Sequence, residues 1–264
     1  MILLANVKNK EKIDSYISNE YSKCLYLYLN YKKYGFASKN VSIYLQQNNS
    51  EITSIILKYY KTIHIYSKNK DVNYNELIKF VLKNNPTMIC GEKEIIENLE
   101  ENLKYKNFVS EYGSIRCLSK IDNVDKLDLE EAQENDFSEI TKLLITDEGL
   151  SGSQTYDSLK KQLLERYKQK FSRNFILRDN GKIIAHVSTG AENEEIAILT
   201  NLIVDNNYRN RGLGKKVCEN FCHKLIENGQ TIFLVTYTKE SAKLYEKIGF
   251  TKSCDWGKLY KKVS

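Results

Sequence analysis

The chain has 264 residues, which is enough for one large domain or for two domains of about 130 residues each. Its net charge of +6 is mild and suits an anionic small molecule as well as a weak attraction to nucleic acid. No apolar run reaches the ~18 residues of a membrane span, and Met1–Ala5 lacks the basic start of a signal peptide, so we expect a cytoplasmic protein without membrane contact.

The first half of the chain predicts alternating strands and helices. Val41, Ile43 and Leu45 alternate with polar residues, and Asn48-Asn49-Ser50 then forms a turn signal. The expected elements are strands at 41–45 and 52–60, a helix around 77–81, a short strand at 87–90 and a helix over 95–103. An acidic stretch at 120–134 then marks a boundary, which divides the chain into domains 1–125 and 126–264.

The second half repeats this alternation more clearly. Asp136 and Glu139 have the spacing of a capping box at the start of a helix, and Asp179-Asn180-Gly181 predicts a hairpin turn. The expected helices cover 136–144, 158–171, 216–227 and 240–248. The expected strands cover 175–177, 182–188, 195–204, 231–237 and 250–260, the last as one or two strands.

The segment Tyr208–Lys215 (YRNRGLGK) lies between a predicted strand and a predicted helix. Main-chain N–H groups at a helix start point outward, and the helix dipole favours negative charge there. Gly212 and Gly214 lack Cβ, so a pyrophosphate can approach the backbone closely. No such segment occurs in the first half, where the corresponding stretch 67–75 contains no glycine.

Arg209-x-x-Gly212-x-Gly214 matches the R/Q-x-x-G-x-G/A signature of the Gcn5-related N-acetyltransferase (GNAT) superfamily. Leu244–Phe250 (LYEKIGF) follows at the expected distance, so about residues 127–261 resemble that superfamily. The resemblance implies an α/β (α+β) fold with a mixed, mostly antiparallel sheet flanked by helices. The first half resembles the degenerate half of tandem GNAT proteins and is expected to form part of the wall of the acceptor cleft.

The resemblance also implies roles for individual residues. Leu202 is expected to polarise the acetyl carbonyl through its N–H, and Tyr245 to protonate the CoA thiolate as general acid. These assignments have alternatives that do not involve catalysis. Tyr245 could be a core residue, and Arg209 and Arg211 could be solvated charges. The residues expected to bind acetyl-CoA are Leu202, Ile203, Val204, Arg209, Asn210, Arg211, Gly212, Leu213, Gly214, Lys215, Thr238, Ser241 and Tyr245.

Two positions depart from the family pattern. Thr238 stands where the family often has asparagine, but threonine can also cap a helix. Ile198 stands where some members carry a glutamate base, so we consider Glu192, Glu194 and Glu195 and select Glu192. Ala191-Glu192-Asn193 resembles an element of tandem GNAT proteins, while an exposed turn charge and a water chain are the alternatives.

Cysteine and histidine residues give no metal site. Cys218, Cys222 and His223 share a helical segment, but the flanking residues are apolar, which favours core cysteines. His186, in the hairpin strand, is either a structural residue or part of the acceptor site.

The function expected from these residues is acetyl transfer from acetyl-CoA to a primary amine by direct attack, with no metal. The acceptor is a small molecule or a peptide amine, and a homodimer is compatible with the sequence. A non-catalytic acyl-CoA sensor or scaffold is the main alternative. Binding of RNA or a protein partner by the lysine- and tyrosine-rich first half is a third reading.

Overall fold

The computed structural model describes residues 1–36, 38–103, 107–122, 124–147 and 155–261. The strands form one 12-stranded sheet that runs through both halves, in the order β1-β2-β3-β4-β5-β12-β6-β11-β10-β9-β8-β7. Among the described strands, β4 with β5 and β10 with β11 are parallel pairs, and the other pairs are antiparallel. The predicted α+β fold with a mixed, mostly antiparallel sheet is confirmed.

The first half contributes six strands and four α-helices to the described fold. The strands are β1 (Ile2–Leu4), β2 (Val41–Asn48), β3 (Glu51–Tyr59), β4 (Thr62–Tyr66), β5 (Met88–Glu92) and β6 (Phe108–Leu118). The helices are α1 (Lys10–Ile17), α2 (Leu25–Tyr34), α3 (Tyr74–Asn84) and α4 (Lys93–Leu103). The sequence predicted β2, β3, β5, α3 and α4, but it did not predict β1, β4, β6, α1 or α2.

The second half follows its predicted order, except that the sequence did not predict its first strand, β7. Its strands are β7 (Glu130–Glu131), β8 (Asn174–Asp179), β9 (Lys182–Glu192), β10 (Ile196–Val204), β11 (Thr231–Thr236) and β12 (Thr251–Lys261). Its helices are α5 (Phe137–Leu144), α7 (Tyr156–Lys168), α8 (Leu213–Glu227) and α9 (Lys239–Ile248). The hairpin between β8 and β9 is confirmed, because Asn180 and Gly181 both have the positive φ that a tight turn of this type requires (49° and 81°).

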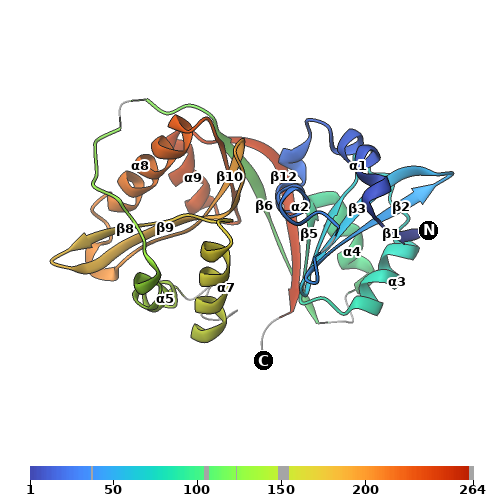
Figure 1. Cartoon of the computed structure of the whole chain (residues 1–264), viewed down its shortest axis with the longest axis horizontal. Coiled ribbons are helices and arrows are strands. Elements are labelled where there is room, and N and C mark those ends of the chain that lie inside the picture. Colours follow the sequence, from blue (N-terminus) through green and yellow to red (C-terminus); the bar gives the residue numbers. More distant parts are fainter. Residues whose placement is uncertain (37, 104–106, 123, 148–154, 262–264) are drawn as a thin grey trace.

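The two halves exchange their last strands at the centre of the sheet. β12 pairs with β5 of the first half, and β6 pairs with β11 of the second half, so β6 and β12 lie side by side between the lobes (Figure 1). Trp256 pairs with Glu92, for example, and Thr236 pairs with Ser114. Each half therefore completes its sheet with a strand from the other half.

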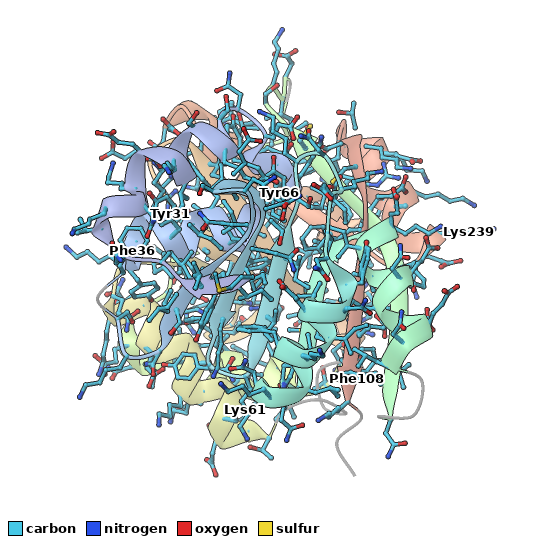
Figure 2. The ribbon with its side chains drawn as sticks, turned by 90° about the vertical axis from the view of Figure 1, so that its right-hand side faces the viewer. Tyr31, Phe36, Lys61, Tyr66, Phe108 and Lys239 are labelled. Atoms are coloured by element: carbon cyan, nitrogen blue, oxygen red, sulfur yellow. The ribbon has the colours of Figure 1, made fainter. Side chains whose placement is uncertain are left out.

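Helices cover both faces of the sheet. On one face, Leu259 of β12 packs with Leu99 of α4, and Leu234 of β11 packs with Phe221 of α8. On the other face lie α1 and α2 of the first half and α5 and α7 of the second half. Tyr31 of α2 contacts Phe36 with ring centroids 5.7 Å apart, and both residues are labelled in Figure 2.

Helix α2 connects the two halves across this second face. Its residues Leu25 and Leu29 share a buried cluster with Ile198 of β10, Phe233 of β11 and Trp256 of β12. Burying side chains of this size contributes about 1.5–3 kcal/mol each. Helix α2 is thus a first-half element that covers second-half strands.

The predicted capping box at the start of α5 is wrong. Asp136 makes no side-chain cap for this helix and instead forms a capping box with Gln133, one turn earlier. Glu139 is also engaged elsewhere, since its Oε1 accepts a hydrogen bond from the Ile183 N–H at 2.8 Å.

Within the described ranges, every helix is too short or too polar to span a bilayer.

Candidate active site

The loop between β10 and α8 forms an open helix N-terminus. Helix α8 begins at Leu213, three residues before the predicted start, because Gly212 adopts a left-handed conformation (φ 73°) and serves as the N-cap. No side chain in the described part of the chain caps this end, and no acidic residue lies in its first turn. The first N–H groups of a helix have no partners within it, so they are available here to an anion.

Two arginines flank this helix start. Nε of Arg209 donates to the Val204 carbonyl at 2.9 Å, and the Arg211 guanidinium lies over the Tyr208 ring at 5.7 Å. Neither arginine has a carboxylate within ion-pair distance among the described residues, whereas Lys215 pairs with Glu219 at 2.9 Å. Asn210 also has positive φ (63°), so the loop turns sharply between them.

The corresponding helix start in the first half is closed. Asn73 caps α3 by accepting a hydrogen bond from the Glu76 N–H at 3.2 Å, and Glu76 places a carboxylate in the first turn. Gln46 binds Asn73 on both sides, since its Nε2 donates to the Asn73 carbonyl and its Oε1 accepts from the Asn73 N–H. The side chains of the protein itself therefore occupy this end, and its first turn carries negative charge.

Strand β10 has an open edge where it leaves β11. The two strands pair only from Ile196 to Ile198, so no described strand lies beside residues 199–204 on that side. A bulge at Asn201 (φ 54°) interrupts the pairing with β9 just before Leu202. Ile203 and Val204 are buried on either face, which fixes the backbone of this segment.

His186 holds this bulge. Its Nδ1 lies 3.0 Å from the Asn201 carbonyl oxygen, and its Nε2 lies 3.1 Å from Oδ1 of Asn174. Burial lowers the pKa of His186 to about 4, so the ring is neutral near pH 7. A neutral imidazole carries one ring proton, so it donates to one of these two oxygens at a time. His186 is therefore a structural residue, which was one of the two alternatives.

Tyr245 lies on α9, beside the open loop. Thr238 caps this helix as the sequence suggested, with Oγ1 accepting from the Ser241 N–H at 3.1 Å, while Ser241 Oγ donates to the Thr238 carbonyl at 3.0 Å. The Tyr245 ring meets Phe250 edge to face at 5.5 Å. Its hydroxyl has no hydrogen-bond partner within the described residues, and burial, followed by the nearby Cys218 and Cys222 thiols, raises the pKa of Tyr245 above its ordinary value.

The first half also contributes to this region through Arg116 of β6. Its Nη2 pairs with Glu246 of α9 at 2.8 Å, and its Nε donates to Thr236 Oγ1 at 3.4 Å. The Arg116 side chain is only 9% exposed. Arg116 stands in the mostly apolar stretch 115–118 at the end of β6, and that charge was the one sequence signal that could have identified this link to the helix carrying Tyr245.

Glu192 forms an ion pair with Arg173. Its two carboxylate oxygens accept from Nε and Nη2 of Arg173 at 2.8 and 3.0 Å, and Arg173 also donates to Gln230 at 2.6 Å. Glu192 pairs with Ala197 of β10, five residues before Leu202, which is roughly 16 Å along a strand. A base at Glu192 remains a prediction, but these contacts and this distance argue against it.

Replacing Glu192 tests that prediction. We expect Glu192→Gln to lower the free energy of unfolding by about 1–3 kcal/mol, because Arg173 loses half of a bidentate charge-assisted contact. The turnover number should change by less than about threefold, measured at saturating amine and acetyl-CoA. A loss of 100-fold or more in a variant that remains folded would instead identify Glu192 as the base.

The cysteine pair in α8 is part of the core. Cys218 and Cys222 are fully buried, with sulfurs 3.9 Å apart, and His223 faces Glu227 at 3.2 Å. Within the residues that the structure describes, no group of three histidine, cysteine or acidic side chains is placed to hold a metal.

Comparison with known proteins agrees with this geometry. Residues 137–250 match the model of the Acetyltransferase (GNAT) family, so the second half of the chain contains a GNAT-family domain. A comparison with curated proteins returns no match.

Solved structures extend the similarity of fold to the whole chain. A Drosophila protein matches with a TM-score of 0.68 at 14% identity, covering 98% of both chains. A GCN5-related N-acetyltransferase from Sphaerobacter thermophilus matches with a TM-score of 0.62 at 9% identity, covering 99% of this chain and 95% of that one. A tandem GNAT protein from the clavulanic acid biosynthesis pathway matches with a TM-score of 0.60 at 8% identity, covering 99% and 98%. At these identities, the similarity concerns the fold.

Proposed function

We propose that the protein transfers an acetyl group from acetyl-CoA to a primary amine by direct attack. The observation that carries this proposal is the contrast between the two helix starts. The start of α8 has open N–H groups and two arginines without carboxylate partners, whereas the start of α3 is capped by Asn73 and carries Glu76. One anionic co-substrate per chain fits this arrangement.

The residues around the open helix start can bind the parts of CoA. The N–H groups of Arg211 to Lys215 would bind the pyrophosphate, helped by the side chain of Arg209. The open edge of β10 at Leu202–Val204 offers N–H and C=O groups to the pantetheine amides. Thr238 and Ser241, at the start of α9, would line the same channel.

The chemical step needs a stabilised oxyanion and a proton for the leaving thiolate. The Leu202 N–H, next to the bulge that His186 holds, would donate to the carbonyl oxygen as the amine nitrogen attacks the carbonyl carbon. The carbon–sulfur bond then breaks, and Tyr245 would give its phenolic proton to the sulfur. The proton that the amine loses would pass to water, since Ile198 replaces the glutamate that some GNAT proteins use.

We also propose that residues 1–125 and 126–264 are two GNAT-like units, of which only the second is catalytic. The closed start of α3 supports this assignment, because Asn73 caps the helix start that corresponds to the open start of α8. A homodimer remains a prediction.

Calorimetric titration with CoA tests the binding site. The double replacement Arg209→Gln/Arg211→Gln should raise the Kd roughly 10- to 100-fold, because at least one charge-assisted contact worth about 1.5–3 kcal/mol is lost. The matched control Lys68→Gln/Lys70→Gln removes two charges from the corresponding loop of the first half and should leave the Kd unchanged. An equal rise of the Kd in both double variants would indicate a general effect of charge and not a specific binding site.

The alternative function is a sensor that binds acyl-CoA without turnover. The observation that favours it is that β10 (Ile196–Val204) contains no acidic residue, since Ile198 is buried there, and that Glu192, at the end of β9, is paired with Arg173. Release of CoA thiol from acetyl-CoA in the presence of an amine distinguishes the two. An enzyme releases thiol in proportion to amine, whereas a sensor binds CoA and releases none.

A further inference from the structure

One arginine of this chain has an electrostatic environment that the proposed CoA site does not explain. The sequence contains six arginines. Arg116, Arg173 and Arg178 form ion pairs with carboxylates, and Arg209 and Arg211 flank the open start of α8. The sixth, Arg166 of α7, has no carboxylate within ion-pair distance among the described residues.

Arg166 points at strand β9 on the face that α2 and α7 cover. Its Nη1 donates to the Gly190 carbonyl, which leaves its other N–H groups without a partner within the described ranges. The neighbouring carboxylate, Glu165, interacts with Tyr60 of the first half instead. A half-buried guanidinium with unused donors costs solvation energy, so an anionic ligand group would stabilise it.

Two first-half side chains lie beside this arginine. The hydroxyl of Tyr26, on α2, lies close to Gly190. A Cβ atom added to Gly190 would lie 3.0 Å from the Tyr26 hydroxyl oxygen and 2.9 Å from the Thr200 methyl carbon. The Tyr26 ring stacks on His64 of β4, with centroids 5.6 Å apart and planes at 28°. The Tyr26 hydroxyl has no hydrogen-bond partner among the described residues.

His64 is a second polar group without a partner. It is 7% exposed, and its Nδ1 is buried without a hydrogen bond. Burial, followed by the charge of Arg166, lowers the pKa of His64 to about 4. The ring is therefore neutral near pH 7, with one nitrogen a donor and the other an acceptor.

These groups lie next to the expected position of the acetyl carbonyl. Thr200 precedes Leu202 by two residues on β10, a distance of roughly 7 Å along a strand. Thr200 and Tyr26 lie on the α2 face of the sheet, while the open start of α8 lies on the other face. An amine on the α2 face could thus reach the acetyl carbon while CoA enters from the α8 side.

We propose that Arg166, Tyr26 and His64 form the acceptor seat, and that the acceptor is a primary amine carrying a carboxylate or a phosphate. The inference rests on the proposed acetyl transfer. Arg166 would bind the anionic group through its free donors, and Tyr26 and His64 would orient the amine over β10. Because Tyr26 and His64 belong to the first half, the seat is shared between the two halves.

Matched pairs of amines test this seat. The probes are L-leucine with 3-methylbutylamine, L-phenylalanine with 2-phenylethylamine, and β-alanine or O-phosphoethanolamine with propylamine. We expect kcat/KM to be at least tenfold higher for an anionic member than for its neutral-tailed partner. Arg166→Gln should abolish that preference and leave the neutral-tailed amines within threefold, whereas Lys161→Gln, an exposed cation on the same helix, should change neither.

Tyr26→Phe should raise KM for the preferred amine while the Kd for CoA stays the same. A preference for β-alanine identifies a carboxylate and a preference for O-phosphoethanolamine a phosphate, and either supports the seat. The seat is overturned if neutral-tailed amines are preferred, or if Arg166→Gln lowers both members of each pair equally.

Binding measurements separate failure of the seat from failure of the proposed function. Calorimetric titration of the same amines into the CoA complex measures the seat without turnover. If CoA binds and no amine is acetylated, the transferase proposal fails. In that case, the seat is still supported if the anionic amines bind and Arg166→Gln weakens their binding tenfold. The seat is overturned if none of the anionic amines binds.

Discussion

A fragment of residues 126–264 is expected neither to fold cooperatively nor to bind CoA, although it contains the whole family match. It lacks β6, which lies between β11 and β12 and buries Ile115 and Leu118. Those two side chains alone contribute about 3–6 kcal/mol, a large share of the 5–15 kcal/mol that stabilises a typical domain. Circular dichroism during urea unfolding and calorimetry with CoA would measure both losses.

Co-expression of residues 1–125 with residues 126–264 is the matched control. The two pieces together contain every strand of the sheet, so the complex should form and bind CoA. Independent folding of the fragment with native CoA affinity would contradict the expectation and show that the strand exchange is dispensable.

Tyr245→Phe is expected to lower kcat by about 100-fold, the lower range for loss of a general acid, while the Kd for CoA is unchanged. Burial raises the pKa of Tyr245 above its ordinary value, so the phenol keeps its proton throughout the neutral and mildly alkaline range. Activity that depends on this proton is present below the raised pKa and is lost only above pH 10. A pH profile of kcat should therefore show no alkaline decline from Tyr245 below pH 10.

Tyr44→Phe is the matched control for this replacement. Tyr44 of β2 is half-buried and meets Phe80 edge to face at 4.8 Å, much as Tyr245 meets Phe250, but it lies in the first half. It should leave kcat unchanged. Equal kcat for Tyr245→Phe and the unaltered protein would remove Tyr245 from the mechanism.

The second half was predictable because its signals are local. Asn180-Gly181 favours a tight turn, and Gly212 readily adopts the left-handed conformation of an N-cap, although the sequence placed the start of α8 three residues too late. The capping box at Asp136 failed for a local reason too. The preceding 3-10 turn satisfies Asp136 first, so the helix begins without it.

The first half was less predictable because several of its elements depend on distant partners. Helix α2 carries tyrosines and lysines between its leucines, and its position is set by contacts with β10, β11 and β12. Strand order is likewise invisible in an alternating pattern, which specifies faces but not neighbours. The roles of Arg116 and Arg166 depend on that order, so the sequence alone did not reveal them.

The central position of β12 also sets the order in which the polypeptide can assemble during synthesis. Residues 88–92 leave the ribosome long before their partners at 256–260, so the edge of β5 has no neighbour until almost the entire chain is made. Contacts between segments so far apart form slowly, and an uncovered strand edge can pair with other chains. We infer that nascent chains interrupted before residue 251 would aggregate or be degraded.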